Sequence, residues 1–253
     1  MSLKKESGIV ISVRPSGDSD SFLDLLTEKG SRLHLIYKGI RKSRKRNLLA
    51  AELGSKIQAD YYESQGRQFY HIKEASLIER YDNLKKDYLG YLVLNSIFEI
   101  LTALYPKGET DEKIFQFLSA VLSKFNESGI HSIGILSFKT RLLHLLGYLP
   151  SMFVCQNCGA DLFEFQEVFL DRYQFGISCP ECNPEKNEPT AVLKLYHRIL
   201  KTNYETLLSL DIQLRTVSRA DLILNQYINS ISHRELKSLE LLYSSLREQK
   251  LDV

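Results

Sequence analysis

Apolar and polar residues alternate in short runs along residues 8–78, and turn residues separate the runs. This pattern predicts a domain of β-strands. The expected strands cover residues 9–13, 22–26, 33–37, 56–62 and 68–78. Five short strands favour a small barrel such as the OB-fold. The pattern alone fits another small β-domain equally well.

Beyond residue 81 the apolar spacing changes to that of helices. The expected helices cover residues 87–105, 111–125, 131–146, 191–209, 218–231 and 234–249. Thr110 is the expected N-cap of the second helix, and Gly147 follows the C-terminal end of the third. Ser218 and Ser232 each precede an acidic residue by three positions, which is the spacing of a capping box. The chain is therefore expected to be α+β.

Four cysteines interrupt the helical part with the spacing of a metal site. Cys155 and Cys158 form one Cys-x-x-Cys pair, and Cys179 and Cys182 form a second pair after 20 intervening residues. Four thiolates complete a tetrahedral shell around Zn²⁺ and leave no position for a substrate, so the ion would be structural. The alternatives are cysteines without a metal and an iron–sulfur site. We expect a zinc ribbon at about residues 151–186.

These patterns divide the chain into two expected domains. Residues 1–80 form the OB-fold domain, which is expected to bind nucleic acid. Residues 81–253 form the helical domain into which the ribbon is inserted. Positive charge is concentrated in the first of these, where 15 Lys and Arg stand against 10 Asp and Glu, whereas the remaining residues hold 18 against 21. An acidic partner is therefore expected to bind the N-terminal domain.

Six cations lie within nine residues of that domain, and no acidic residue interrupts them. The expected nucleic-acid contacts are Tyr37, Lys38, Arg41, Lys42, Arg44, Lys45 and Arg46. Lysine and arginine neutralise phosphates, and the release of counterions favours binding. The Tyr37 ring offers a surface on which a base can stack, with Phe22, Tyr61, Tyr62, Phe69 and Tyr70 as candidate neighbours, about half of them expected in the core. The alternative is a solvated loop without a ligand.

Other candidate chemistry is weaker. Asp18, Asp20 and Asp24 suit a β-turn better than a Mg²⁺ site. His233 and Glu235 have the H-x-E spacing of zinc deaminases, but they follow the cysteines rather than precede them. The sequence contains no Walker A, G-x-S-x-G or G-x-G-x-x-G motif. We therefore expect a protein that is not an enzyme.

Composition is ordinary for a globular protein, with 43% hydrophobic and 25% charged residues. No apolar run approaches the ~18 residues that span a bilayer, and the N-terminal residues lack the apolar core of a signal peptide. A cytoplasmic location and no membrane partner are expected. In such a reducing compartment, four cysteines favour metal binding over disulfides.

The order of these parts resembles the RecO family of bacterial recombination mediator proteins. The matching stretches are residues 19–30, 37–43, 91–95, 138–150, 155–159 and 233–238. The most specific is the Leu-Gly-Tyr-x-Pro segment that ends at Pro150, followed by Cys-x-x-Cys-Gly. Glu28 and the aspartates at 18–24 depart from the strongly basic surface usual in the family. A single glycine after Phe175 stands where the family has a glycine pair.

The resemblance implies an N-terminal OB-fold, a helical domain and an inserted zinc ribbon. It also implies binding of single- and double-stranded DNA, annealing of complementary strands, and loading of recombinase together with RecR onto DNA coated by single-strand-binding protein. Lys38, Arg41, Lys42 and Arg44 correspond to the family's basic region. The helical domain is similar to a docking site for the C-terminal tail of single-strand-binding protein, for which Lys139 and Arg141 are candidates. A nucleoid-associated location is implied.

Three other functions remain compatible with the sequence. A zinc-ribbon RNA-binding or transcription-associated module would use the same cysteines and cations. A docking scaffold would bind a tail peptide without binding DNA. A nuclease would need Asp18, Asp20 and Asp24 to hold a metal.

Overall fold

The structure is a computed structural model that describes residues 2–63, 66, 68–232 and 234–248. It is α+β, and the chain divides into two compact units. The first comprises residues 1–98 and 105–129, and the second comprises residues 99–104 and 130–253. The segments 81–98 and 105–129 belong to the same compact unit as the barrel, so these units are not the expected domains 1–80 and 81–253, which remain a prediction.

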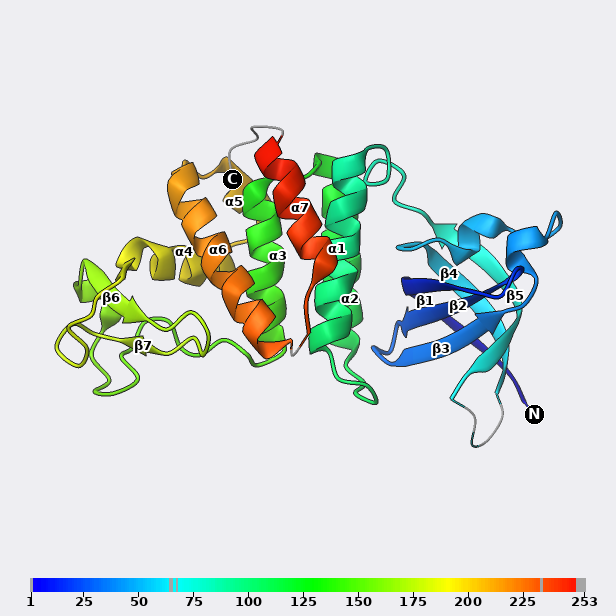
Figure 1. The fold of residues 1–253 in the computed structure, drawn as a ribbon, viewed down its shortest axis with the longest axis horizontal. Coiled ribbons are helices and arrows are strands. Elements are labelled where there is room, and N and C mark those ends of the chain that lie inside the picture. The colour runs from blue at the N-terminus through cyan, green and yellow to red at the C-terminus, as the bar shows by residue number, and fades with distance from the viewer. Residues whose placement is uncertain (1, 64–65, 67, 233, 249–253) are drawn as a thin grey trace. The chain divides into compact units, whose positions relative to one another are not determined.

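Five strands of the first unit close into a barrel, drawn in blue and cyan in Figure 1. They are β1 (Ser2–Ser16), β2 (Asp20–Thr27), β3 (Arg32–Tyr37), β4 (Lys56–Glu63) and β5 (Tyr70–Glu79). The order around the barrel is β1-β2-β3-β5-β4, and β1 pairs with β4 to close it. Only the β3–β5 pair is parallel. This confirms the expected OB-fold.

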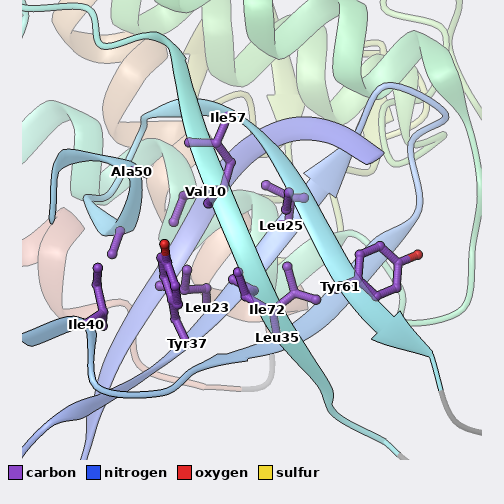
Figure 2. Packing of buried hydrophobic residues seen from close by; sticks show 13 residues of the cluster. Val10, Leu23, Leu25, Leu35, Tyr37, Ile40, Ala50, Ile57, Tyr61 and Ile72 are labelled. Carbon is purple, nitrogen blue, oxygen red and sulfur yellow. The ribbon is translucent and has the colours of Figure 1, made fainter. Parts of the chain in front are cut away.

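Alternating positions of the strands fill the barrel core, as Figure 2 shows. Leu23 and Leu25 of β2 face Leu35 of β3 inside the barrel. Two short 3₁₀ helices, η1 (Ile40–Lys42) and η2 (Leu48–Ala51), add Ile40 and Ala50 to the same core. The segment between β3 and β4 is therefore attached to the barrel at both of its ends.

Two helices continue the first unit. Helix α1 (Tyr88–Leu104) lies within one turn of the expected range, and α2 (Glu112–Ser128) follows. The N-cap of α2 is Asp111, whose carboxylate accepts a hydrogen bond from the Lys113 amide at 2.9 Å. The expectation that Thr110 caps this helix was wrong by one residue, because a carboxylate one position later reaches the free amide.

The second unit holds five further helices among the residues described. They are α3 (Ser132–Leu145), α4 (Thr190–Lys201), α5 (Tyr204–Ser209), α6 (Leu214–Ile231) and α7 (Lys237–Glu248). Gly147 has a φ of 78° just after α3, as its place after a helix predicts. The single helix expected over 191–209 is interrupted, because Asn203 starts α5 by accepting a hydrogen bond from the Thr206 amide at 2.8 Å.

Both expected capping boxes are wrong. Helix α6 begins at Leu214, so Ser218 lies inside it, and its partner Asp221 is buried. Helix α7 begins at Lys237, and Ser232 is the C-terminal cap of α6 instead. Spacing alone does not distinguish a cap from the same residue types within a helix.

The cysteine ribbon is built on three short strands of the second unit. Strand β6 (Glu167–Leu170) pairs with β7 (Ile177–Ser178) and with β8 (Glu188–Pro189). The β6–β7 hairpin reverses the chain, so that the second cysteine pair returns to the first. Phe175 adopts a φ of 56° in this hairpin, a backbone conformation that favours glycine. Its ring is fully buried against Tyr196 and Tyr227, so packing offsets the unfavourable backbone conformation.

Candidate nucleic-acid interface and metal centre

The six expected cations lie on the connection between β3 and β4, which we call the basic loop (residues 38–46). All six side chains are exposed. Arg41 donates to the carbonyl of Gly17 at 3.1 Å, and the ammonium of Lys42 lies 4.0 Å from the carboxylate of Asp18. Among the residues described, Arg44 and Lys45 make no ion pair. Their charge is thus available to an anion.

The backbone of the basic loop is held by specific hydrogen bonds. Gly39, with a φ of 68°, donates its amide to the carboxylate of Asp20 at 2.8 Å. The Arg41 amide donates to the Ser19 carbonyl at 2.9 Å. The Ser43 hydroxyl accepts hydrogen bonds from the amides of Lys45 and Arg46. Because the loop is tied to β2 and to itself, its cations are presented by an ordered turn.

The hydrogen bond from the Gly39 amide to the Asp20 carboxylate, which anchors the basic loop, depends on pH. The Gly39 amide, and then the Ser19 hydroxyl, lower the pKa of the Asp20 carboxyl below its usual 3.8. A lowered folded-state pKa stabilises the fold above 3.8, and the contribution is lost as the pH falls through the folded value. We expect the Gly39 amide to be protected from hydrogen exchange at neutral pH and to lose this protection as the pH falls through the folded-state pKa of Asp20, which lies below 3.8. The Asp20→Ala variant should lack this protection even at neutral pH; equal protection in the variant would contradict the anchor.

Tyr37 does not occupy the expected place. Its side chain is 1% exposed and lies in the barrel core, beside Ile40 and Leu23 in Figure 2. The guanidinium of Arg46 lies 5.1 Å from the centre of the ring. Tyr37 cannot stack on a base in this position, so the expectation is corrected. Its ring instead makes a cation–π contact with Arg46 of the basic loop.

The other candidate rings divide between the core and the surface. Tyr61 is buried, and Tyr70 packs against the core beside it. Phe22, Tyr62 and Phe69 are partly exposed. Phe22 and Phe69 contact each other on the outer face of the barrel, with ring centres 5.1 Å apart. Some of the candidate rings therefore lie in the core and others at the surface, as expected. Tyr37, which was expected at the surface, lies in the core.

The three aspartates of the β1–β2 region do not gather around a common point. Asp20 serves the basic loop, and Asp24 lies against His34, with Nδ1 and Oδ1 2.6 Å apart. Asp18 is exposed in the turn. In the part of the chain that the structure describes, the four cysteines alone form a group suited to a metal.

The four cysteine sulfurs lie within 4.8 Å of one another. The Sγ atoms of Cys158 and Cys179 are 3.7 Å apart, much too far for a disulfide. Four sulfurs at about 2.3 Å from one Zn²⁺ are separated by about 3.8 Å in a tetrahedron. A cluster of several iron atoms would hold the sulfurs farther apart. The donor set and its spacing therefore fit a single zinc ion.

Backbone amides around Cys155 favour its thiolate, whereas hydrogen bonds with the neighbouring cysteine side chains raise the pKa of the exposed Cys182 thiol to about 12. Burial raises the pKa of the Cys155 thiol, but hydrogen bonds from the amides of Cys179, Cys158 and Asn157 outweigh it and lower this pKa to about 6. Gly159, with a φ of 78°, donates its amide to the Cys155 carbonyl at 2.9 Å and closes the first turn. Amide donors aimed at sulfur are typical of metal-binding Cys-x-x-Cys turns. Cys155 and Cys179 are buried, while Cys158 and Cys182 are exposed.

A buried carboxylate joins the ribbon to the helices. Glu188 of β8 is fully buried and accepts hydrogen bonds from the guanidinium groups of Arg172 in the ribbon and Arg219 in α6, at 2.6–3.1 Å. His197 of α4 lies between Phe153 and Phe163 of the ribbon. The ribbon is thus an integral part of the second unit.

Glu188→Gln removes the charge that both guanidiniums share. We expect the free energy of unfolding to fall by about 2 kcal/mol in chemical denaturation, because hydrogen bonds to charged groups in buried sites are among the stronger ones. Glu167→Gln is the matched control, since Glu167 forms an exposed pair with Lys186 at 3.5 Å. Its effect should stay below roughly 0.5 kcal/mol. Equal effects of the two variants would contradict a stabilising role for Glu188 between Arg172 and Arg219.

Lys139 and Arg141 are not surface contacts. Lys139 is fully buried; its ammonium forms an ion pair with Asp221 and donates to Asn225 at 2.8 Å and to the Tyr243 hydroxyl at 2.6 Å. Burial lowers its pKa, and the Asp221 carboxylate opposes that shift. Arg141 donates to the carbonyls of Ile199 and Thr202 at the end of α4. Both side chains stabilise the helical unit, so the expectation that they meet a partner is corrected.

His233 lies outside the described residues, and the deaminase spacing is therefore not examined by the structure. None of the helices in the described ranges is both long and apolar enough to cross a membrane.

The first unit is a closed OB-fold barrel with an ordered basic loop, a class of protein that in other cases binds oligonucleotides or oligosaccharides, and the second unit carries a four-cysteine ribbon. The chain matches the family model for Recombination protein O N terminal over residues 1–81 and that for Recombination protein O C terminal over residues 85–240. The chain belongs to the RecO family. Membership supports a role in DNA repair and recombination.

Relatives cover nearly the whole chain. DNA repair protein RecO of Leptospira biflexa is 35% identical over 97% of this chain and 99% of its own length. The proteins of the same name from Symbiobacterium thermophilum and Thermoanaerobacter sp. are 26% and 27% identical, each over 96% of this chain and over 97% and 98% of their own lengths. A likeness to asparaginyl-tRNA synthetase of Entamoeba histolytica has a TM-score of 0.25 at 11% identity, covers 68% and 38% of the two chains, and carries no argument.

Proposed function

We propose that this protein is a DNA-binding recombination mediator that anneals complementary strands and helps to load recombinase onto DNA coated by single-strand-binding protein. The basic loop is the observation that carries the proposal. Six exposed cations on an anchored turn beside a barrel of this type suit phosphates, and the names of the relatives point to DNA repair.

The mechanism is physical and uses no bond-making residue. Cations of the basic loop bind the phosphates of a strand and lower the repulsion between two complementary strands. Base pairing then supplies the free energy of annealing. Cys155, Cys158, Cys179 and Cys182 would hold a zinc ion, which would supply no bond-making chemistry and would stabilise the ribbon that packs against α4 and α6. The protein therefore acts as a mediator and not as an enzyme.

An annealing assay tests this function. Two complementary strands, one with a donor and one with an acceptor fluorophore, are mixed with and without the protein at low salt. We expect pairing to accelerate by at least tenfold at protein concentrations that saturate the strands. Binding of RNA in preference to DNA without annealing would favour the transcription-associated alternative, whereas the absence of any nucleic-acid binding would favour the scaffold. Metal-dependent cleavage of the strands would favour a nuclease.

The partners that family resemblance implies are RecR and the acidic C-terminal tail of single-strand-binding protein. We place the tail in an open groove of about 1280 Å³ between α6, α7 and the start of α4. The groove is lined by the apolar side chains of Leu222, Leu236 and Leu239 and by the charged side chains of Arg215, Arg219, Arg234, Glu235 and Glu240. Arg215→Glu should weaken binding of a labelled tail peptide by tenfold or more, while unchanged binding would exclude this groove. We propose a nucleoid-associated, cytoplasmic location for the same work.

A further inference from the structure

Three aromatic rings meet on the outer face of the barrel, away from its core. Phe22 of β2, His34 of β3 and Phe69, the residue before β5, form this ring cluster. The Phe69 ring centre lies 5.1 Å from that of Phe22 and 5.8 Å from that of His34. All three side chains are partly exposed. Strands that are distant in sequence thus bring one group of rings to a single surface.

The alternation of the strands fixes which way these rings point. The side chains of Leu23 and Leu25 fill the core. Phe22 comes directly before Leu23 on the same strand, so its side chain faces outward. Leu35 lies in the core, and its neighbour His34 therefore faces outward as well. An outer face that only meets water is usually polar. Two phenylalanine rings at such positions form an apolar patch to which the face of a planar ligand can pack.

A buried ionic group holds the ring cluster in place. The Asp24 carboxylate lies 2.6 Å from Nδ1 of His34, 3.9 Å from the guanidinium of Arg32 and 3.8 Å from that of Arg14. The side chains of Asp24 and Arg32 are 8% and 6% exposed, whereas that of Arg14 is 60% exposed. The hydrogen bond to Asp24 therefore fixes the orientation of the His34 ring. The Arg14 side chain is exposed, so a phosphate can reach its guanidinium.

The ring cluster adjoins the basic loop. Phe22 pairs with Ile36 in the β2–β3 register, and the basic loop begins two residues later at Lys38. This surface combines β2 and β3 with Phe69 next to the start of β5, and the face of strands 2 and 3 is where OB-folds bind oligonucleotides. A strand whose phosphates contact the basic loop would bring its bases over these rings.

We infer that the ring cluster is a stacking site for the unpaired bases of single-stranded nucleic acid, and that it makes the protein bind single strands more tightly than duplexes. The inference rests on the proposed DNA binding and deepens it. Bases in a duplex are already stacked on one another and cannot cover the rings, whereas phosphates of both forms can contact the basic loop. Single strands therefore gain a contribution that duplexes lack.

The chain contains no tryptophan, which makes a direct test possible. Phe69→Trp places one indole in the ring cluster, and Tyr173→Trp places one at a side chain of the ribbon that is 66% exposed. Both variants are titrated with oligo(dT) and with a duplex hairpin, while anisotropy of labelled DNA reports binding independently. We expect oligo(dT) to quench the Phe69→Trp emission by half or more, and the hairpin to leave it nearly unchanged. The Tyr173→Trp emission should respond to neither.

A second variant tests the same site without an indole. Phe22→Leu with Phe69→Leu keeps apolar packing but removes both phenyl rings. We expect affinity for oligo(dT) to fall on the order of 10-fold to 100-fold and affinity for the hairpin to stay within about twofold. DNA binding without quenching, or equal losses for both ligands, would overturn the stacking site while the proposed function stands. The absence of all DNA binding in the wild-type protein would overturn the proposed function as well.

Discussion

Replacing Arg41, Lys42, Arg44 and Lys45 together by alanine is expected to weaken single-stranded DNA binding by about 100-fold or more at low salt. These side chains are exposed on a turn that the barrel holds in place. Each phosphate contact contributes a slope of about −0.7 to the dependence of log affinity on log salt for single strands. The variant should therefore lose up to about three units of slope, as measured by fluorescence anisotropy at several salt concentrations.

A control of equal charge separates this effect from the loss of net charge. Lys107, Lys113, Lys201 and Lys237 are exposed lysines outside the basic loop, and replacing all four by alanine removes the same charge. We expect this control to stay within about threefold of the wild-type affinity, because its lysines contact no phosphate. Equal losses in the two variants would mean that binding is diffuse, and would contradict an interface at the basic loop. Thermal unfolding of both variants verifies that each is folded.

Cys179→Ser is expected to abolish zinc binding and to destabilise the helical unit before it affects DNA binding. Cys179 is fully buried, and its amide donates to the Cys155 sulfur at 3.3 Å. Loss of a structural ion removes a large part of the folding free energy of a small metal site. We expect the Tm to fall by roughly 10 °C or more, with DNA affinity within about threefold at temperatures where the variant is folded.

Metal analysis and chelation complete that test. The wild-type protein should contain one zinc ion per chain, and a strong chelator should lower its Tm as the substitution does. A variant with unchanged zinc content and Tm would contradict the metal site. Iron in place of zinc, with visible absorbance, would favour the iron–sulfur alternative.

The barrel and the cysteine site were predictable because their signals are local. Alternation along each strand determines which residues face the core, and two Cys-x-x-Cys turns determine the donor set. The error at Tyr37 could have been avoided by the same rule. Tyr37 is separated from Leu33 and Leu35 by even numbers of residues, so it points to the same face of β3, which is the core. Phe22 is adjacent to Leu23, so it points to the opposite face of β2. Position within the strand was thus a better guide than proximity to the cations.

The helical unit was less predictable because its key pairs are distant in sequence. Lysine is usually a surface residue. Lys139 can be buried because Asp221, 82 positions later in the sequence, supplies the opposite charge. The same Asp221 satisfies the spacing of a capping box with Ser218, although it lies inside α6. No local pattern reports a partner supplied by another helix. Predictions for this unit therefore held for the existence of most helices but not for their caps or for the contacts of their charged residues.

The most direct test of the central claim is the binding of a labelled single-stranded oligonucleotide to the wild-type protein, measured by fluorescence anisotropy across a range of salt concentrations. The proposed interface predicts tight binding at low salt and a steep, linear decrease of log affinity with log salt, with a slope of about −3 to −4 for four to six phosphate contacts. Absence of binding at low salt, or affinity independent of salt, would contradict a phosphate-binding basic loop. The protein would then have to act through protein docking instead.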